Sequence, residues 1–265
     1  MDFLPVLKAI ILGIVEGVTE FLPISSTGHL ILVNQWVSFD PAFTKLFDVI
    51  IQLGAILAVV VYFRNEICPC TAPKEKRPEI FALWKKLLIG VLPAIVLGAL
   101  FASKIEEKLF NPLTVSIALV IGGVALVMIE KRKHKEVFTS IKQLGVKTVL
   151  LIGLFQCLAM IPGTSRSAAT IIGALLLGAS RVVAVEFSFF LAIPTMIAAS
   201  GYTLIKHWQN LSSMDFALLA VGFLTAFFVA YLVISQFMQF IRKHSLAVFG
   251  HYRIILGILI LLFLN

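Results

Sequence analysis

The chain has 265 residues, of which 60% are hydrophobic and 14% are charged, and its formal net charge is +8. A soluble domain carries about 25% charged residues, so this composition excludes an ordinary soluble protein and is typical of a chain embedded in a bilayer. The positive charge does not indicate nucleic-acid binding, because the basic residues cluster in short segments between apolar runs rather than in a soluble basic domain.

Six apolar runs are predicted to cross the bilayer as helices. The alternating pattern that a closed barrel requires is not seen in the sequence. The sequence therefore predicts an all-α polytopic membrane protein with six transmembrane helices. The predicted spans are 46–63, 87–103, 113–129, 185–205, 214–238 and 254–264, the last extended backward to residue 249.

Two further apolar pairs are each broken in the middle by Pro, Gly, Ser and Thr: 3–22 with 24–37, and 148–161 with 168–179. A shift of 140 positions superimposes the first pair on the second and sets Glu16 on Gln156, Ser26 on Arg166 and Phe47 on Phe187. We expect two repeats, 1–140 and 141–265, that together make one membrane domain. Each repeat contains one broken pair followed by three spans.

The distribution of Lys and Arg between the spans predicts the orientation. The loops 64–86, 131–147 and 241–253 are rich in both residue types and are expected in the cytoplasm, whereas 104–112 and 206–213 are poor in them and are expected outside. This alternation requires each broken pair to return to the side from which it entered. The sequence therefore predicts two re-entrant helix pairs in an inverted-topology repeat, with both termini outside.

The tip of the first broken pair lies in the stretch EGVTEFLPISSTGH, residues 16–29. Glu16 and Glu20 are four residues apart, so they share one face of a helix, and Pro23 ends that helix. Carboxylates beside a helix C-terminus favour a cation, and oxygen ligands favour Mg²⁺ or Ca²⁺. The first tip is thus a predicted site for a divalent cation.

Hydroxyl groups follow Pro23 directly. Either Ser25 or Ser26 is expected to cap a new helix, whose free N–H groups can hold an anion. His29 lies three residues after Ser26, so it is predicted to reach the same region as the Ser26 hydroxyl.

The second tip reads IPGTSRSAAT, residues 161–170. Gly163 follows a proline in a turn and permits close approach of a ligand to the backbone. Either Thr164 or Ser165 caps the next helix. Arg166 then adds a forked cation that suits phosphate oxygens.

If the two tips meet, they form a cradle for a diphosphate group, and phosphoryl transfer needs little beyond positioning, charge neutralisation and a nucleophile. Either Ser26 or a water molecule is the expected nucleophile, with His29 as general base or acid. Purely structural roles are the alternative: the glutamates would pair with Arg166, the hydroxyls would only cap helices, and His29 would only satisfy a buried carbonyl. The predicted phosphate-binding residues are Ser25, Thr27, Gly163, Thr164, Ser165, Arg166 and Ser167.

These motifs resemble those of the bacterial undecaprenyl-diphosphatase family, also called the bacitracin-resistance (BacA/UppP) family. The resemblance rests on residues 16–29, on FDVIIQLGAILAVVV at 47–61, on PGTSRSAAT at 162–170 and on EFSFFLAIPTMIAA at 186–199, and it covers essentially the whole chain. It implies an inner-membrane enzyme that removes the terminal phosphate of undecaprenyl diphosphate, recycles the cell-wall lipid carrier and confers bacitracin resistance.

The resemblance also implies roles for individual residues. Glu16 and Glu20 would serve metal binding and catalysis, Ser26 would be the nucleophile assisted by His29, and Arg166 would bind phosphate. The site would face the periplasm and depend on a divalent cation, and an oligomer is not required. The alternative that the repeats leave open is a polyprenyl-phosphate flippase or other secondary transporter.

Overall fold

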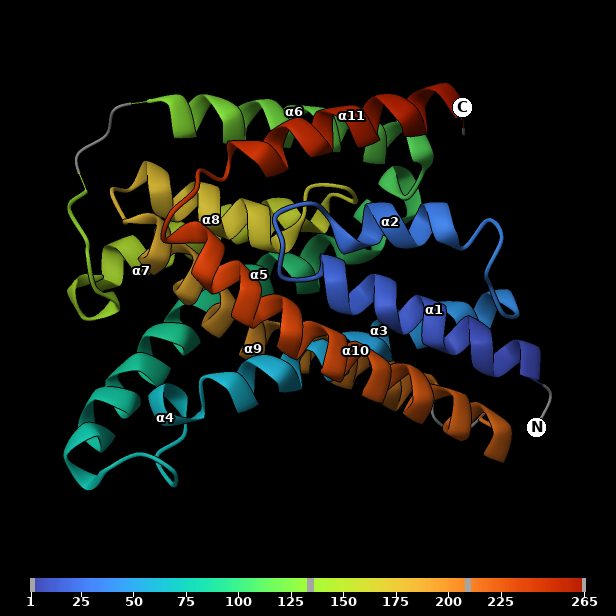
Figure 1. Ribbon diagram of the computed structural model, residues 1–265, viewed down its shortest axis with the longest axis horizontal. Helices are drawn as coiled ribbons and strands as arrows, with labels where there is room; N and C mark the ends of the chain where they lie inside the picture. Colours follow the sequence, from blue (N-terminus) through green and yellow to red (C-terminus); the bar gives the residue numbers. More distant parts are fainter. Residues whose placement is uncertain (1–2, 133–135, 208–210, 264–265) are drawn as a thin grey trace.

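The computed structural model describes residues 3–132, 136–207 and 211–263, and these residues form helices and loops without a named strand. Figure 1 shows the helices packed along the long axis of the molecule. In chain order they are α1 Phe3–Thr19, α2 Ser26–Val33, α3 Pro41–Tyr62, α4 Arg64–Ile67, η1 Lys74–Lys76, α5 Arg77–Leu109, α6 Pro112–Lys131, η2 Ile141–Gln143, α7 Val146–Gln156, η3 Cys157–Met160, α8 Arg166–Leu176, α9 Arg181–His207, α10 Ser213–Ile241 and α11 Ala247–Phe263.

Within the described ranges, five helices are long and apolar enough to cross a membrane, which confirms a multi-pass, all-helical protein. Four of them are α3, α6, α9 and α10, and the fifth is the apolar part of α5. They correspond to the first five predicted spans. The sixth, predicted at 254–264 with its extension to 249, corresponds to α11, an apolar helix of 17 residues.

Two pairs of long helices approach each other closely because glycines line their interfaces. A Cβ on Gly54 of α3 would meet the backbone of Phe223 on α10, and a Cβ on Gly123 of α6 would meet the carbonyl of Gly250 on α11. In Figure 1, α6 and α11 lie side by side, and α10 crosses α3 and α1 below them.

Each broken pair consists of two separate helices whose connection lies inside the molecule. Residues 20–25 join α1 to α2, and residues 161–165 join η3 to α8. We call these segments the first tip and the second tip. They are tied directly to each other, because the Ser167 hydroxyl at the start of α8 donates a hydrogen bond of 2.9 Å to the carbonyl of Leu22. Phe21 of the first tip is fully buried in the largest apolar core.

The start of α1 and the end of α11 lie at one end of the molecule, and the connections α3–α4–α5 and α10–α11, the end of α6 and η2 lie at the other end (Figure 1). Several basic residues expected in loops lie in α-helices instead. They are Arg64 on α4, Arg77, Lys85 and Lys86 on α5, Lys131 on α6, Lys147 on α7 and Arg253 on α11. A hydropathy pattern marks only the apolar part of a helix, whereas its backbone hydrogen bonds continue through charged residues. The predicted loop residues 133–135 and 208–210 lie outside the described residues.

Candidate active site

Both tips use the same backbone device to start their second helix. Ser25 caps α2 with φ 73° and Ser165 caps α8 with φ 71°, and among the described residues they are the only non-glycine positions with positive φ. Their hydroxyl oxygens accept hydrogen bonds from the N–H groups of Gly28 and Ala168 at 3.3 and 3.2 Å. Left-handed backbone at a non-glycine residue is strained and concentrates at functional sites. Because Ser25 and Ser165 are the caps, the neighbouring Ser26 and Arg166 side chains are free for other contacts.

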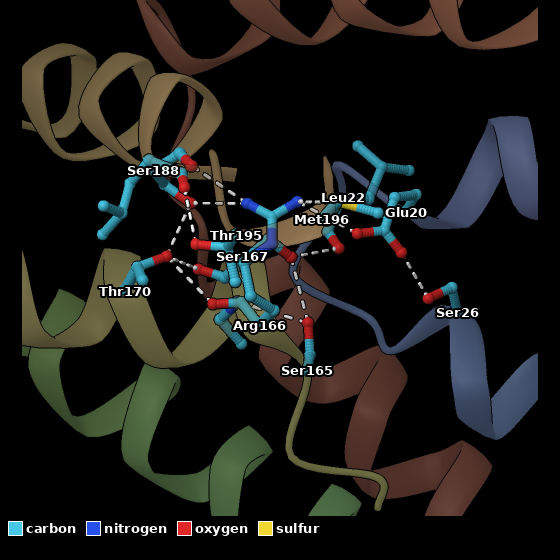
Figure 2. A network of polar contacts seen from close by, with 12 residues as sticks. Glu20, Leu22, Ser26, Ser165, Arg166, Ser167, Thr170, Ser188, Thr195 and Met196 are labelled. Carbon is cyan, nitrogen blue, oxygen red and sulfur yellow. Dashed lines mark hydrogen bonds and ion pairs between the residues drawn. The ribbon is translucent and has the colours of Figure 1, made fainter. Parts of the chain in front are cut away.

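Glu20 connects the two tips through a chain of polar contacts (Figure 2). Its Oε1 accepts a hydrogen bond of 3.0 Å from Arg166 Nη2, and its Oε2 accepts one of 2.6 Å from the Ser26 hydroxyl. The Glu20 and Arg166 side chains are only 7% and 11% exposed. The Glu20 carboxylate therefore holds both the Arg166 guanidinium and the Ser26 hydroxyl in a site largely shielded from solvent, where charge-assisted hydrogen bonds are strong.

Arg166 is held by α9 as well as by Glu20. Its Nη1 donates to the carbonyl of Ser188 at 2.9 Å, and the guanidinium lies 5.6 Å from the centre of the Phe21 ring. Its Nε is buried without a hydrogen-bond partner. The sequence motif at 186–199 contained Ser188, but composition gave no reason to single it out. The site thus presents a fixed guanidinium with one unused donor, as an anion site requires.

The remaining residues of the second tip shape its backbone. Gly163 has φ 90°, and a Cβ at this position would meet the backbone of Val115 on α6, so only glycine fits. The hydroxyls of Ser165 and Ser167 are 3.0 Å apart. Thr164 is half-buried in the second tip, as is Thr27 in the first turn of α2.

His29 is positioned differently from the expectation. Its Nδ1 lies 2.7 Å from the carbonyl of Ser25, and its Nε2 lies 2.7 Å from the hydroxyl of Tyr252 on α11. A carbonyl only accepts, so Nδ1 carries the proton and Nε2 of the neutral ring accepts from Tyr252. Neither ring nitrogen is bonded to Ser26, whose hydroxyl donates to Glu20 instead. In this geometry Glu20 occupies the position of a general base for Ser26.

Glu16 provides the test of whether a divalent cation fits the first tip. Its side chain is fully buried, and neither carboxylate oxygen has a hydrogen-bond partner. It interacts electrostatically with the carboxylates of Glu20 and Asp48 and with the Arg166 guanidinium. Buried oxygens without donors fit a hard cation. Among the described residues, no group of three or more His, Cys, Asp or Glu side chains could hold a metal ion by itself. Phosphate oxygens and water would complete the coordination, which is the usual arrangement for Mg²⁺.

Comparison with known proteins shows the same pattern over nearly the whole chain. The family described as bacitracin resistance protein BacA matches residues 9–259. The chain is 48% identical over 264 residues to undecaprenyl-diphosphatase 1 of Clostridioides difficile (strain 630), covering 98% of this chain and 96% of that protein. It is 52% identical over 263 residues to an undecaprenyl-diphosphatase of Fusobacterium nucleatum subsp. nucleatum, covering 96% and 99%. The chain therefore belongs to the bacitracin resistance protein BacA family.

Proposed function

We propose that this protein is an integral membrane phosphatase that hydrolyses undecaprenyl diphosphate to undecaprenyl phosphate and inorganic phosphate. Relatives about half identical to it over nearly its full length are named undecaprenyl-diphosphatases. The observation that carries the chemistry is the chain of contacts from Arg166 through Glu20 to the Ser26 hydroxyl. The reaction recycles the lipid carrier for cell-wall synthesis and so confers resistance to bacitracin.

The terminal phosphate of the substrate binds between the tips. The unused Nε donor of Arg166 and the free N–H groups at the start of α8 supply its hydrogen bonds. The hydroxyls of Ser165 and Ser167 line the same turn, and Thr27 lies on the first turn of α2. These donors lie in a largely buried site, so they stabilise the charge of the phosphoryl group without competition from bulk water.

Ser26 is the nucleophile. Its oxygen attacks the terminal phosphorus while its proton passes to Glu20 Oε2, 2.6 Å away. The bond from this phosphorus to the bridging oxygen breaks, and undecaprenyl phosphate leaves with the bonding electrons. The departing undecaprenyl phosphate takes that proton from Glu20, which is ionised again. Glu20 then takes a proton from a water molecule as the water oxygen attacks the phosphoserine. The Ser26 oxygen leaves and takes the proton back from Glu20, which restores the hydroxyl and releases inorganic phosphate. The histidine, held by Ser25 and Tyr252, orients the turn that carries Ser26.

A divalent cation, Mg²⁺ or Ca²⁺, would be held by Glu16 together with Glu20. When bound, it would neutralise charge on the diphosphate oxygens. The buried carboxylate oxygens of Glu16, which have no hydrogen-bond partner, support this assignment.

For the topology, we propose six spanning helices and two re-entrant pairs in inverted repeats, 1–140 and 141–265. The protein would lie in the bacterial inner membrane with both termini and the site opening on the periplasmic side. Support comes from the basic connections around α4 and η2, which lie at the end of the molecule opposite to the start of α1 and the end of α11 (Figure 1).

The apolar tail of the substrate has a matching surface. A groove of about 540 Å³ runs between α6 and the helices α7 and α8, and its lining is almost entirely apolar, from Thr164 at the second tip to Ile129 and Leu176. Each buried CH₂ group contributes roughly 0.8 kcal/mol, so part of a polyprenyl chain would bind there well. We assign this groove, from here on the tail groove, to the isoprenoid segment next to the diphosphate.

The test is phosphate release by purified protein in detergent with substrate labelled in its terminal phosphate. We expect phosphate release without any ion gradient, whereas a transporter would release no phosphate. Acid quenching should trap the label on a peptide containing Ser26. If phosphate is released without any label on the protein, and if Ser26→Ala keeps this activity, then water and not Ser26 is the nucleophile. Absence of phosphate release by the folded wild type would refute the proposed function itself.

A further inference from the structure

Among the residues that the structure describes, Arg253 is the most deeply buried charged side chain apart from Glu16. It lies in the apolar helix α11, one position after Tyr252, and it is 0% exposed. The sequence placed it in a cytoplasmic loop. A guanidinium inside a membrane protein is costly unless partners compensate it, and such residues are usually functional.

The partners of Arg253 are five backbone carbonyls. Nε donates to Leu119, and Nη2 donates to Ala118 as well, both on α6. Nη1 donates to Pro23 of the first tip at 3.3 Å. Nη2 also donates to Gly163 and Thr164 of the second tip at 3.2 and 2.9 Å. One side chain thus joins both tips to the same helix.

This arrangement answers a specific need of the tips. Their backbone is non-helical within the protein interior, so its carbonyls require donors that neither helix supplies. Arginine presents five N–H groups in a rigid fork, whereas lysine presents a single nitrogen. The acceptors stand next to the reacting groups: Pro23 is three residues before Ser26, and Thr164 is two residues before Arg166. The position of the guanidinium therefore sets the spacing of Ser26 and Arg166.

The surrounding helix leaves room for this fork. A Cβ on Gly122 of α6 would fall on Arg253 Nη2, so only glycine at 122 admits the guanidinium in this position. On the other side of the site, Tyr252 holds His29, so two consecutive residues of α11 act on the tips.

We propose that Arg253 is a positioning residue whose forked guanidinium holds the first and second tips in register, so that Ser26, Glu20 and Arg166 meet around one phosphate. This inference rests on the proposed phosphatase function and adds to it a residue that does not touch the reacting atoms.

The experiment compares Arg253→Lys, Arg253→Met and Gly122→Ala with two matched controls. Arg181→Met removes another arginine with a buried partner: Arg181 is itself 42% exposed and binds the buried Glu130 at 2.8 Å, at the start of α9 and the end of α6. Gly98→Ala is the same substitution as Gly122→Ala at a position with nothing within 4 Å of the added Cβ. Each protein is purified in detergent, and kcat, KM, the melting temperature and amide hydrogen exchange are measured.

We expect kcat to fall about 100-fold in Arg253→Lys and further in Arg253→Met, because misplacement by about 1 Å has an effect of this size. Gly122→Ala should lower kcat about tenfold by displacing the fork, a smaller loss than removing it. KM should change less than about threefold in the two Arg253 variants, since Arg253 does not line the tail groove. Amide exchange should accelerate in peptides covering 20–26 and 161–166 but not in α3 or α10. The controls should keep wild-type kcat, although Arg181→Met melts at a lower temperature.

Wild-type kcat in Arg253→Lys would overturn the proposal, because charge alone would then suffice. Faster exchange throughout all helices, with kcat falling only as folded protein is lost, would also overturn it and leave a general structural role. If the wild type releases no phosphate, the proposed function fails. Amide hydrogen exchange at the two tips of the Arg253 variants still tests whether Arg253 holds them in position.

Discussion

The helices α2 and α8, which follow the first and second tips, start with the same kind of cap but carry side chains of different chemistry. Ser25 and Ser165 stand 140 positions apart, cap their helices alike and share an unusual positive φ. The residue after the cap, which is the first residue of the helix, is Ser26 in α2 and Arg166 in α8. The two helices thus start with similar caps and differ in the side chain that follows each cap.

The difference extends one helix back. Glu16 of α1 is fully buried with unpartnered oxygens, whereas Gln156 of α7, which the 140-residue shift sets opposite it, accepts a hydrogen bond of 3.3 Å from Thr195. The buried carboxylates of Glu16 and Glu20 therefore lie beside the first tip, and the Arg166 guanidinium lies beside the second. In the proposed mechanism, a phosphate between the tips meets a nucleophile on one side and a guanidinium on the other, which two identical tips would not provide.

The largest expected effect comes from removing the charge contrast itself. Arg166→Met should lower kcat about 10³-fold or more, the scale of a lost phosphate-binding arginine. It should also destabilise the protein by about 3–5 kcal/mol, because Glu20 is left buried without its partner. The double variant Arg166→Met/Glu20→Gln should recover stability but no activity. Phosphate release and thermal unfolding measure both quantities. Equal stability in the single and double variants would contradict a buried ion pair between Arg166 and Glu20.

The adjacent residues Ser25 and Ser26 distinguish the catalytic role of a serine from its role as a helix cap. Ser26→Ala should lower kcat on the order of 10³-fold with little change in melting temperature, because its oxygen is the proposed nucleophile. Ser25→Ala removes the cap of α2 and should reduce stability by about 1 kcal/mol. Its kcat should fall less than that of Ser26→Ala. The reverse order of the two kcat values would show that the caps were assigned to the wrong serine.

The effect of Mg²⁺ on turnover and melting temperature should depend on Glu16 and not on Gln156. A chelator should abolish turnover of the wild type, and added Mg²⁺ should restore it and raise the melting temperature, since a ligand that binds the native state stabilises it. Glu16→Gln should lose that temperature shift. Gln156→Glu, the matched change in the second repeat, should keep it. A shift that survives in Glu16→Gln would place the cation away from Glu16.

Much of this arrangement could be predicted because apolar length and repeated motifs are local properties of the chain. The spans, the broken pairs and the meeting of Glu20 with Arg166 follow from them. The choice between Ser25 and Ser26 as cap could not be predicted, since it depends on φ at one residue.

Two contacts depend on residues distant in the chain. Tyr252 reaches His29 from 223 positions away, and no short motif connects them. Arg253 was missed for a different reason. It borders the apolar run and was counted as the end of a loop, although a charge between Tyr252 and Ile254 was itself a signal of an internal partner.

The smallest expected effect concerns the tail groove, which only the second tip borders. Ala125 lines the groove on α6, so Ala125→Phe should block it and raise KM for undecaprenyl diphosphate roughly tenfold, equivalent to 1.4 kcal/mol of binding. Val124→Phe is the matched control, because Val124 is 41% exposed on the same helix and does not line the groove. Geranyl diphosphate should be hydrolysed equally well by both variants, since its short chain fills only part of the groove. A KM change shared by the two variants, or by the two substrates, would mean that the tail leaves the site along another path.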